Sequence, residues 1–219
     1  MNPSVASVFT VLHGPLHCLR SALAMRIPLS LFILLQLGDG PNLSAQDGTF
    51  EILKGGEVVG HIQVGRAING DRISYTMTSS SEIDIIWTQH VRTSLATEYV
   101  GERVVHCCGT IHVNDGVRDS SHMRTVGEKA LCYIHPGEVF AASITNTWTT
   151  ARMYYEEPMG QDSIFVESAL KECPLVRTGE GLYDLTLPGN NVNHYIYRDG
   201  VLREVRVDRT WLDLVFRRV

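Results

Sequence analysis

The sequence predicts an all-β, mainly antiparallel protein whose strands form a meander that curls into a barrel or half-barrel, with at most one or two short helices. Three observations support this fold class. Apolar residues recur with a period of two from Phe50 onward, and turn dipeptides separate the apolar runs. The alternation of helical and strand patterns that would predict a parallel sheet does not occur. Residues 46–219 are expected to form a single β domain.

Residues 1–45 have the pattern of a signal peptide. Arg26 provides a positive charge, an apolar run of 11 residues extends from Ile27 to Leu37, and the small residues Ser44 and Ala45 follow. The apolar run is shorter than the roughly 20 residues that a membrane-spanning helix needs. We therefore expect export, cleavage near Ala45, and no transmembrane span in the mature chain.

The residues before Met25 are unusual in front of such a leader, so translation could begin at Met1 or at Met25. Cys18 precedes the apolar run and no cysteine follows it at the position of a lipid-modified cysteine, which argues against a lipoprotein anchor. The expected location is the periplasm or cell envelope.

The alternating runs assign one face of each strand to the interior of the curled sheet. In VLREVRVD (201–208), Arg203 is the one exception to a face formed by Val201, Val205 and Val207. The residues expected inside are Val58, Ile62, Val64, Tyr195, Tyr197, Val205, Leu214 and Phe216. A small barrel either packs its interior or holds one small ligand, so the aromatic Tyr195, Tyr197 and Phe216 are the candidate ligand-binding residues.

Turn dipeptides mark the hairpins, because their residues readily adopt the positive φ angles of tight turns. The spacing between them leaves strands of about 6–10 residues. Residues 143–157 are the least strand-like part and are predicted to hold one short helix or a crossover. The turn pairs are Gly55-Gly56, Asn69-Gly70, Asp115-Gly116, Pro188-Gly189 and Asp199-Gly200.

The stretch MYYEEPMGQDSIF (153–165) places two carboxylates beside two tyrosines and a proline. As an acid/base site it would need carboxyl groups about 5–9.5 Å apart across a substrate, whereas neighbours on an extended strand point apart. The favoured interpretation is a structural corner, in which one glutamate accepts backbone hydrogen bonds while Tyr154 or Tyr155 packs beneath. The corner motif is Tyr155, Glu156, Glu157 and Pro158.

The charge balance disfavours nucleic-acid binding. The chain has 19 Lys and Arg against 24 Asp and Glu, and only Arg20, Arg26 and Asp39 of these precede residue 46, which leaves 17 basic and 23 acidic residues. A phosphate-binding surface needs concentrated positive charge. We therefore expect no nucleic-acid partner.

The exported chain would retain four cysteines, and disulfides persist outside the cytosol. Four cysteines allow three pairings, between which the sequence cannot choose. The alternative is that they are small buried residues or free thiols. The four are Cys107, Cys108, Cys132 and Cys173.

Metal and nucleophile motifs are absent. No CxxC, HExxH or G-x-S-x-G pattern occurs. His106, Cys108 and His112 share a face, but His106 and His112 lie about 20 Å apart on an extended strand, so a metal site would need His122 or Cys132 from neighbouring strands. We assign no metal, cofactor or catalytic residue; a hydrolase or metal-dependent enzyme is a minor alternative.

Three segments resemble a family of small exported β proteins from Gram-negative bacteria that is classed as a domain of unknown function. They are FEILKGGEVVGHIQV, RMYYEEPMGQDSIFVE and GLYDLTLPGNNVNHYIYRDGVLREVRVD. The most specific elements are the aromatic-Glu-Glu-Pro corner and the Tyr-x-Leu-x-Leu-Pro hairpin from Tyr183 to Pro188. The resemblance runs from about residue 50 to the C-terminus and implies a single exported β domain, without assigning catalytic residues.

The favoured function is a non-enzymatic cell-envelope binding module for an apolar small molecule or lipid. The alternative is a structural or interaction module that binds another envelope protein through an exposed edge or face. The interior discriminates between them, because a cavity of roughly 300–1,000 Å³ favours ligand binding, whereas a filled core favours the interaction module.

Overall fold

The structure is a computed structural model that describes residues 44–84, 87–142, 147–209 and 212–219. Fourteen strands and one short helix form in these residues. They are β1 (Ser44–Lys54), β2 (Glu57–Asn69), β3 (Arg72–Asp84), β4 (Thr88–Val100), β5 (Arg103–Val113), β6 (Gly116–Val126), β7 (Lys129–Ile134), β8 (Glu138–Ala142), α1 (Thr150–Met153), β9 (Ser163–Val166), β10 (Lys171–Gly179), β11 (Leu182–Leu187), β12 (Asn191–Arg198), β13 (Val201–Val207) and β14 (Leu214–Arg218).

All fourteen strands belong to one antiparallel sheet in the order β8-β7-β6-β5-β4-β3-β2-β1-β14-β13-β12-β11-β10-β9. Each hairpin joins neighbours, and β1 pairs with β14, with Phe50 opposite Arg218. The chain thus makes two meanders, which we call the first half (β1–β8) and the second half (β9–β14). This confirms the predicted all-β meander. The two end strands, β8 and β9, do not pair with each other, so the barrel is not closed.

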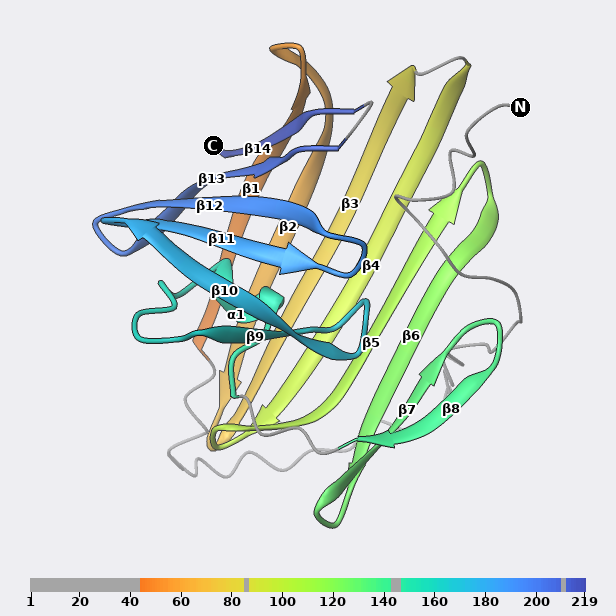
Figure 1. Ribbon diagram of the computed structural model, residues 1–219, viewed down its shortest axis with the longest axis vertical. Coiled ribbons are helices and arrows are strands. Elements are labelled where there is room, and N and C mark those ends of the chain that lie inside the picture. Colours follow the sequence, from red (N-terminus) through yellow and green to blue (C-terminus); the bar gives the residue numbers. More distant parts are fainter. Residues whose placement is uncertain (1–43, 85–86, 143–146, 210–211) are drawn as a thin grey trace, which may run out of the picture.

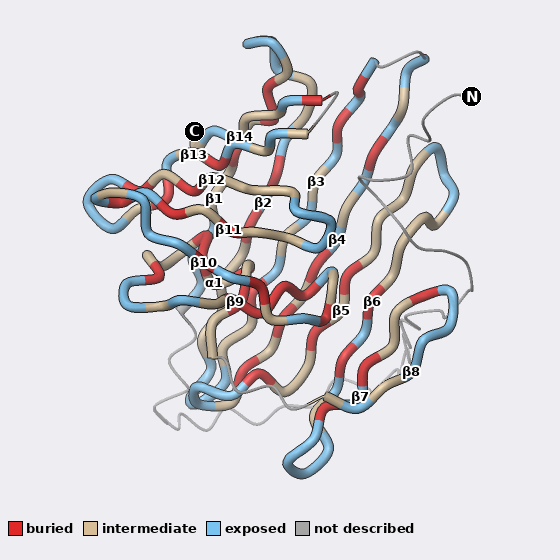
Figure 2. Tube along the Cα trace, in the orientation of Figure 1, coloured by how far each residue is buried: buried red, intermediate tan, exposed pale blue. Residues whose placement is uncertain are grey.

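The second half lies across the first, and the connection through α1 runs between them (Figure 1). Buried residues concentrate where the two halves face each other (Figure 2). Strand β9 is buried on both faces: Ile164 and Val166 belong to a cluster with β1, β2 and β10–β13, whereas Phe165 belongs to a cluster with β3–β7. We call the space between the halves the trough.

The hairpin turns lie at the predicted dipeptides, with a one-residue shift at two of them. Asn69 ends β2, so Gly70, with a φ of 63°, and Asp71 form that turn. Gly55 and Gly56 have φ angles of 60° and 92°, and Asp199 and Gly200 have 53° and 72°. At the predicted Asp115-Gly116 turn, the positive φ angles fall on Asn114 and Asp115, and Gly116 begins β6. Strands β2, β3 and β4 have 13 residues each and β1, β5 and β6 have 11, all longer than the predicted length of about 6–10 residues.

Two β-bulges correct the predicted inner faces. On β2, Leu53 pairs with Val58 and Ile52 with Gly60, so Val59 is an extra residue and the alternation shifts there. Val58 is 48% exposed instead of buried, and Val59 packs against the core.

The second bulge lies on β13. Tyr197 pairs with Leu202 and Ile196 with Glu204, so Arg203 is the extra residue. The period-two pattern predicts Val201 on the inner face. In the structure the neighbouring Leu202 is buried there instead. The apparent exception at Arg203 was therefore the signature of a bulge.

The predicted short helix in residues 143–157 is confirmed as α1 (Thr150–Met153). Thr149 caps it: its side-chain oxygen accepts a hydrogen bond from the Arg152 amide. Among the residues that the structure describes, no helix has the length and apolar character needed to cross a bilayer.

Candidate functional site

We call residues 147–158, which include α1, the corner segment; it lies in the trough. Ala151 and Met153 of α1 are buried. The Tyr197 hydroxyl on β12 donates a 2.6 Å hydrogen bond to the Met153 carbonyl oxygen, and the Tyr154 ring meets the Phe50 ring edge-on at 5.2 Å between centroids. These contacts attach the corner segment to both halves of the sheet.

Glu156 binds the first half. Its Oε1 lies 3.1 Å from an Arg66 guanidinium nitrogen on β2 and accepts a 3.4 Å hydrogen bond from the Tyr75 hydroxyl on β3. Its Oε2 accepts from Nε and Nη2 of Arg152, at 2.9 and 2.7 Å. The Arg152 guanidinium also stacks on the Trp148 ring, 4.2 Å from its centroid.

Glu157 binds the second half. Its Oε1 accepts a 2.8 Å hydrogen bond from the Tyr183 hydroxyl on β11. Burial and this bond raise the pKa of Tyr183 to about 12. Pro158 is buried, and the Tyr155 ring lies against Tyr75 at 5.5 Å between centroids. Glu156 and Glu157 of the corner motif therefore bind side chains, whereas the sequence had suggested backbone amides as the partners.

The backbone-binding carboxylate is Glu167, directly after β9, which sequence reasoning missed. Its side chain is fully buried. It accepts hydrogen bonds from the Thr150 and Ala151 amides at 3.1 and 3.0 Å, from the Thr97 hydroxyl at 3.1 Å, and from the Thr150 hydroxyl. These amides are the free donors at the first turn of α1. A lone glutamate that ends the apolar run SIFV was the available signal.

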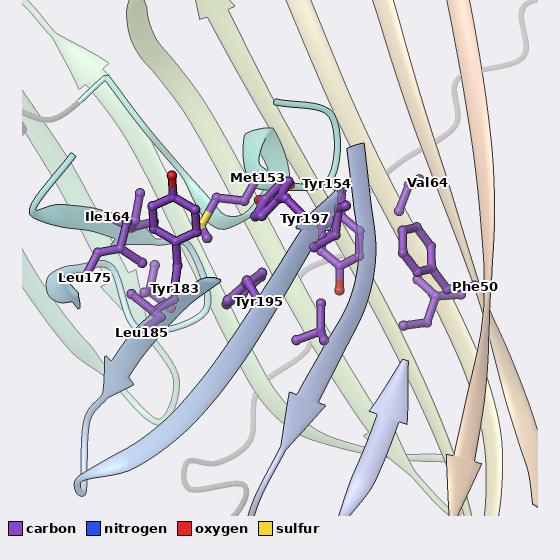
Figure 3. Packing of buried hydrophobic residues seen from close by; sticks show 14 of the residues in the cluster. Phe50, Val64, Met153, Tyr154, Ile164, Leu175, Tyr183, Leu185, Tyr195 and Tyr197 are labelled. Atoms are coloured by element: carbon purple, nitrogen blue, oxygen red, sulfur yellow. The ribbon is translucent and has the colours of Figure 1, made fainter. Parts of the chain in front are cut away.

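The three predicted ligand-binding residues belong to the packed core. Tyr195 and Tyr197 are each 3% exposed and lie in the aromatic cluster beside Met153 and Tyr183 (Figure 3). Phe216 is partly buried and packs against the same cluster. Burial raises the pKa of Tyr195 and of Tyr197 well above the usual value. The structure fills this part of the interior with side chains.

A cavity of about 580 Å³ lies instead at the seam, where the β8 edge faces β9 and the start of β10. We call it the seam cleft. It is a shallow cleft that is broadly open to solvent. Its lining residues are Ile134, Glu138, Phe140, Ala142, Phe165, Ala169, Leu170, Lys171 and Glu172.

The seam cleft has an apolar floor and a charged rim. Phe165 and Leu170 are buried at its base, and Phe140 contributes a half-buried ring from β8. Glu138 and Lys171 are exposed at the rim. This arrangement suits a ligand with an apolar chain and a polar head. The sequence gives little signal for it, because the cleft arises from two sheet edges that fail to pair.

The four cysteines form no disulfide in the structure. Cys107 and Cys132 are buried on the same inner face, but both pair with Met123 of β6, which lies between them. Two strand spacings of about 4.8 Å place them beyond the roughly 7 Å Cα separation that a disulfide tolerates. Burial raises the pKa of Cys107, Cys132 and Cys173, which makes these thiols poor nucleophiles.

The histidines of β5 and β6 lie on the outer face of the first half. Nε2 of His106 and Nε2 of His122 are 3.1 Å apart. Cys132, the other partner suggested for a metal site, points to the inner face. His112 lies near the far end of β5, beyond a register shift at which Arg118 of β6 is an extra residue. Within the described ranges, no group of three or more His, Cys, Asp or Glu could hold a metal ion.

Comparison with known proteins identifies the family. Residues 50–219 match the family described as a domain of unknown function, DUF6134, and the chain belongs to it. This confirms the expected membership of an uncharacterised family. A search of curated proteins finds no match.

A solved structure shares the fold. It is the crystal structure of a "beta-barrel-like protein of domain of unknown function DUF1849 from Brucella abortus", which is 9% identical, with a TM-score of 0.51 over 82% of this chain and 98% of that chain. At this identity the likeness shows a β-barrel-like fold.

Proposed function

We propose that this DUF6134 protein is an exported, non-enzymatic binding module that holds an apolar or amphiphilic ligand, such as a lipid, in the seam cleft. The single observation that carries the proposal is the cleft itself. Its volume of about 580 Å³ lies within the range of roughly 300–1,000 Å³ that is typical of small-molecule sites. The residues first expected to bind the ligand, Tyr195, Tyr197 and Phe216, belong to or pack against a different buried cluster and do not line the cleft.

The chemistry of the cleft supports an amphiphile over a fully apolar molecule. Burying an apolar chain against Phe140, Phe165 and Leu170 would stabilise the complex by about 25 cal/mol per Å² of apolar surface removed from water. The opening to solvent leaves a polar head in contact with water and with the rim. A head group therefore need not be dehydrated for the chain to bind.

Export to the periplasm or cell envelope is part of the proposal and rests on the leader pattern in residues 25–45. Intact-mass measurement on protein from an envelope fraction should give a chain that begins near Gln46. A full-length species recovered from the cytosol would contradict it.

Native mass spectrometry of protein purified from its own envelope tests ligand binding. The expected result is a population heavier than the polypeptide by the mass of one small apolar molecule, which organic extraction removes and identifies. Uniformly unliganded protein, together with no binding of an added fluorescent fatty acid, would contradict the proposal.

A protein-interaction module is the second candidate, and one observation favours it. The outer face of the β7–β8 hairpin exposes Leu131 (51%) and Val139 (73%) beside the unpaired edge of β8. An exposed edge with apolar neighbours can accept a strand from a partner. A Val139→Lys variant that retains the ligand but loses a co-purifying envelope protein would favour this candidate.

A further inference from the structure

We propose that His106 and His122 form a binding site for a late first-row divalent cation such as Zn²⁺ on the outer face of the first half. The site is independent of the seam cleft, which opens from the inner face. It uses two imidazoles from neighbouring strands and leaves the other coordination positions to water or to a partner.

The strand pattern places the two rings together. Cys107 and Met123 are paired across β5 and β6 and are fully buried on the inner face. Their neighbours, His106 and His122, therefore point outward from adjacent strands. The ring centroids are 5.0 Å apart, and the side chains are not covered by other elements.

The distance between the ligating atoms fits one metal ion. Nε2 of His106 and Nε2 of His122 are 3.1 Å apart. Two histidine nitrogens that each lie about 2.0–2.1 Å from a tetrahedral zinc ion are about 3.3–3.4 Å apart. The separation thus differs from the metal-bound value by a few tenths of an ångström, and a turn of the two rings that directs both lone pairs at one ion would replace the His–His hydrogen bond with two metal bonds.

The charges around the pair are balanced. Glu98 on β4 and Arg124 on β6 are both paired with His106 in the sheet register, so one carboxylate and one guanidinium flank the site. Cys108 is paired with His122 and lies on the same outward face, but within the described residues no third side chain joins the two imidazoles in a metal-binding group.

Calorimetric titration of the protein with ZnCl₂ at pH 7.5, after chelator treatment, tests the proposal. The expected result is one site, with affinity that falls at least about tenfold in His106→Gln and in His122→Gln, because each substitution destroys the chelate. Binding should also weaken below about pH 6, since histidine must lose its proton to ligate a metal.

His61→Gln is the matched control, because His61 is an exposed histidine on the outer face of β2. It should bind zinc like the unsubstituted protein. Absorption bands of bound Co²⁺ provide a second readout, and circular dichroism checks that each variant is folded. Zinc affinity and Co²⁺ spectra that are unchanged in both His106→Gln and His122→Gln would overturn the proposal.

Discussion

The corner and the seam lie in the same trough and differ in what occupies it. At the corner, α1 fills the space between the two halves. Glu156, Glu157 and Glu167 bind both sides through side-chain and backbone donors. At the seam, the β8 edge faces the β9–β10 hairpin without pairing, and a cavity of about 580 Å³ remains. The comparison teaches that one connecting segment decides which part of a half-barrel is packed core and which part stays open.

The largest effect should come from Glu167. Glu167→Ala leaves the Thr97 hydroxyl and the first amides of α1 without an acceptor in a buried site. We expect a loss of about 3–5 kcal/mol in the free energy of unfolding, as when one partner of a buried charged network is removed. Urea unfolding followed by circular dichroism measures it.

Glu57→Ala is the control, since Glu57 is exposed at the start of β2; its unfolding midpoint should not change. A Glu167→Ala protein as stable as the control would mean that the corner does not hold the halves together, and the distinction between corner and seam would fail.

Glu156→Gln should have a smaller effect, because its carboxylate is partly solvated, with the side chain 29% exposed. The substitution removes the charge that faces Arg66 and Arg152 but keeps the shape. We expect a loss of about 1–2 kcal/mol in the free energy of unfolding. If a substrate is found and Glu156→Gln or Glu157→Gln abolishes turnover at an unchanged melting temperature, the corner is an acid/base site instead.

The smallest effect concerns alkaline pH. The pKa of Tyr183 is raised from 10.0 to about 12 by burial and by its bond to Glu157. The neutral phenol is therefore favoured in the folded state, so its contribution to stability is complete below pH 10 and disappears as the pH rises toward 12. Tyr183→Phe should flatten this decline. An identical pH profile for the variant in urea unfolding would show that Tyr183 does not titrate in contact with the corner.

Period-two alternation and turn dipeptides predicted the antiparallel meander and five of its turns, and the least strand-like region indicated the short helix. The turns at Gly101, Gly127 and Gly181 were not predicted. These patterns could not place Val58 or Val201, because a bulge adds one residue and inverts every later position on the strand. The role of Glu167 as a hydrogen-bond acceptor was not predicted, because its donors at Thr97 and Ala151 are far away in sequence.

The candidate site was less predictable than the fold. Aromatic residues on inner faces indicated Tyr195 and Tyr197 equally well as packed core or as pocket, and only the position of α1 distinguishes the two. The cleft at Phe140 and Leu170 follows from which strands end the sheet. Sequence patterns predict how neighbouring strands pair. An opening between two unpaired edges depends on how the complete sheet curls, which local patterns do not determine.

Binding of a fluorescent fatty acid to two neighbouring variants tests the central claim most directly. Ala142 lines the seam cleft, whereas Ala141, the preceding residue of β8, is exposed on the outer face. Ala142→Trp should fill the cleft and weaken binding by at least about tenfold, since roughly 1.4 kcal/mol of lost contact suffices for that factor. Ala141→Trp should bind as the unsubstituted protein does. Equal binding by both variants would show that the ligand does not occupy the seam and would contradict the account.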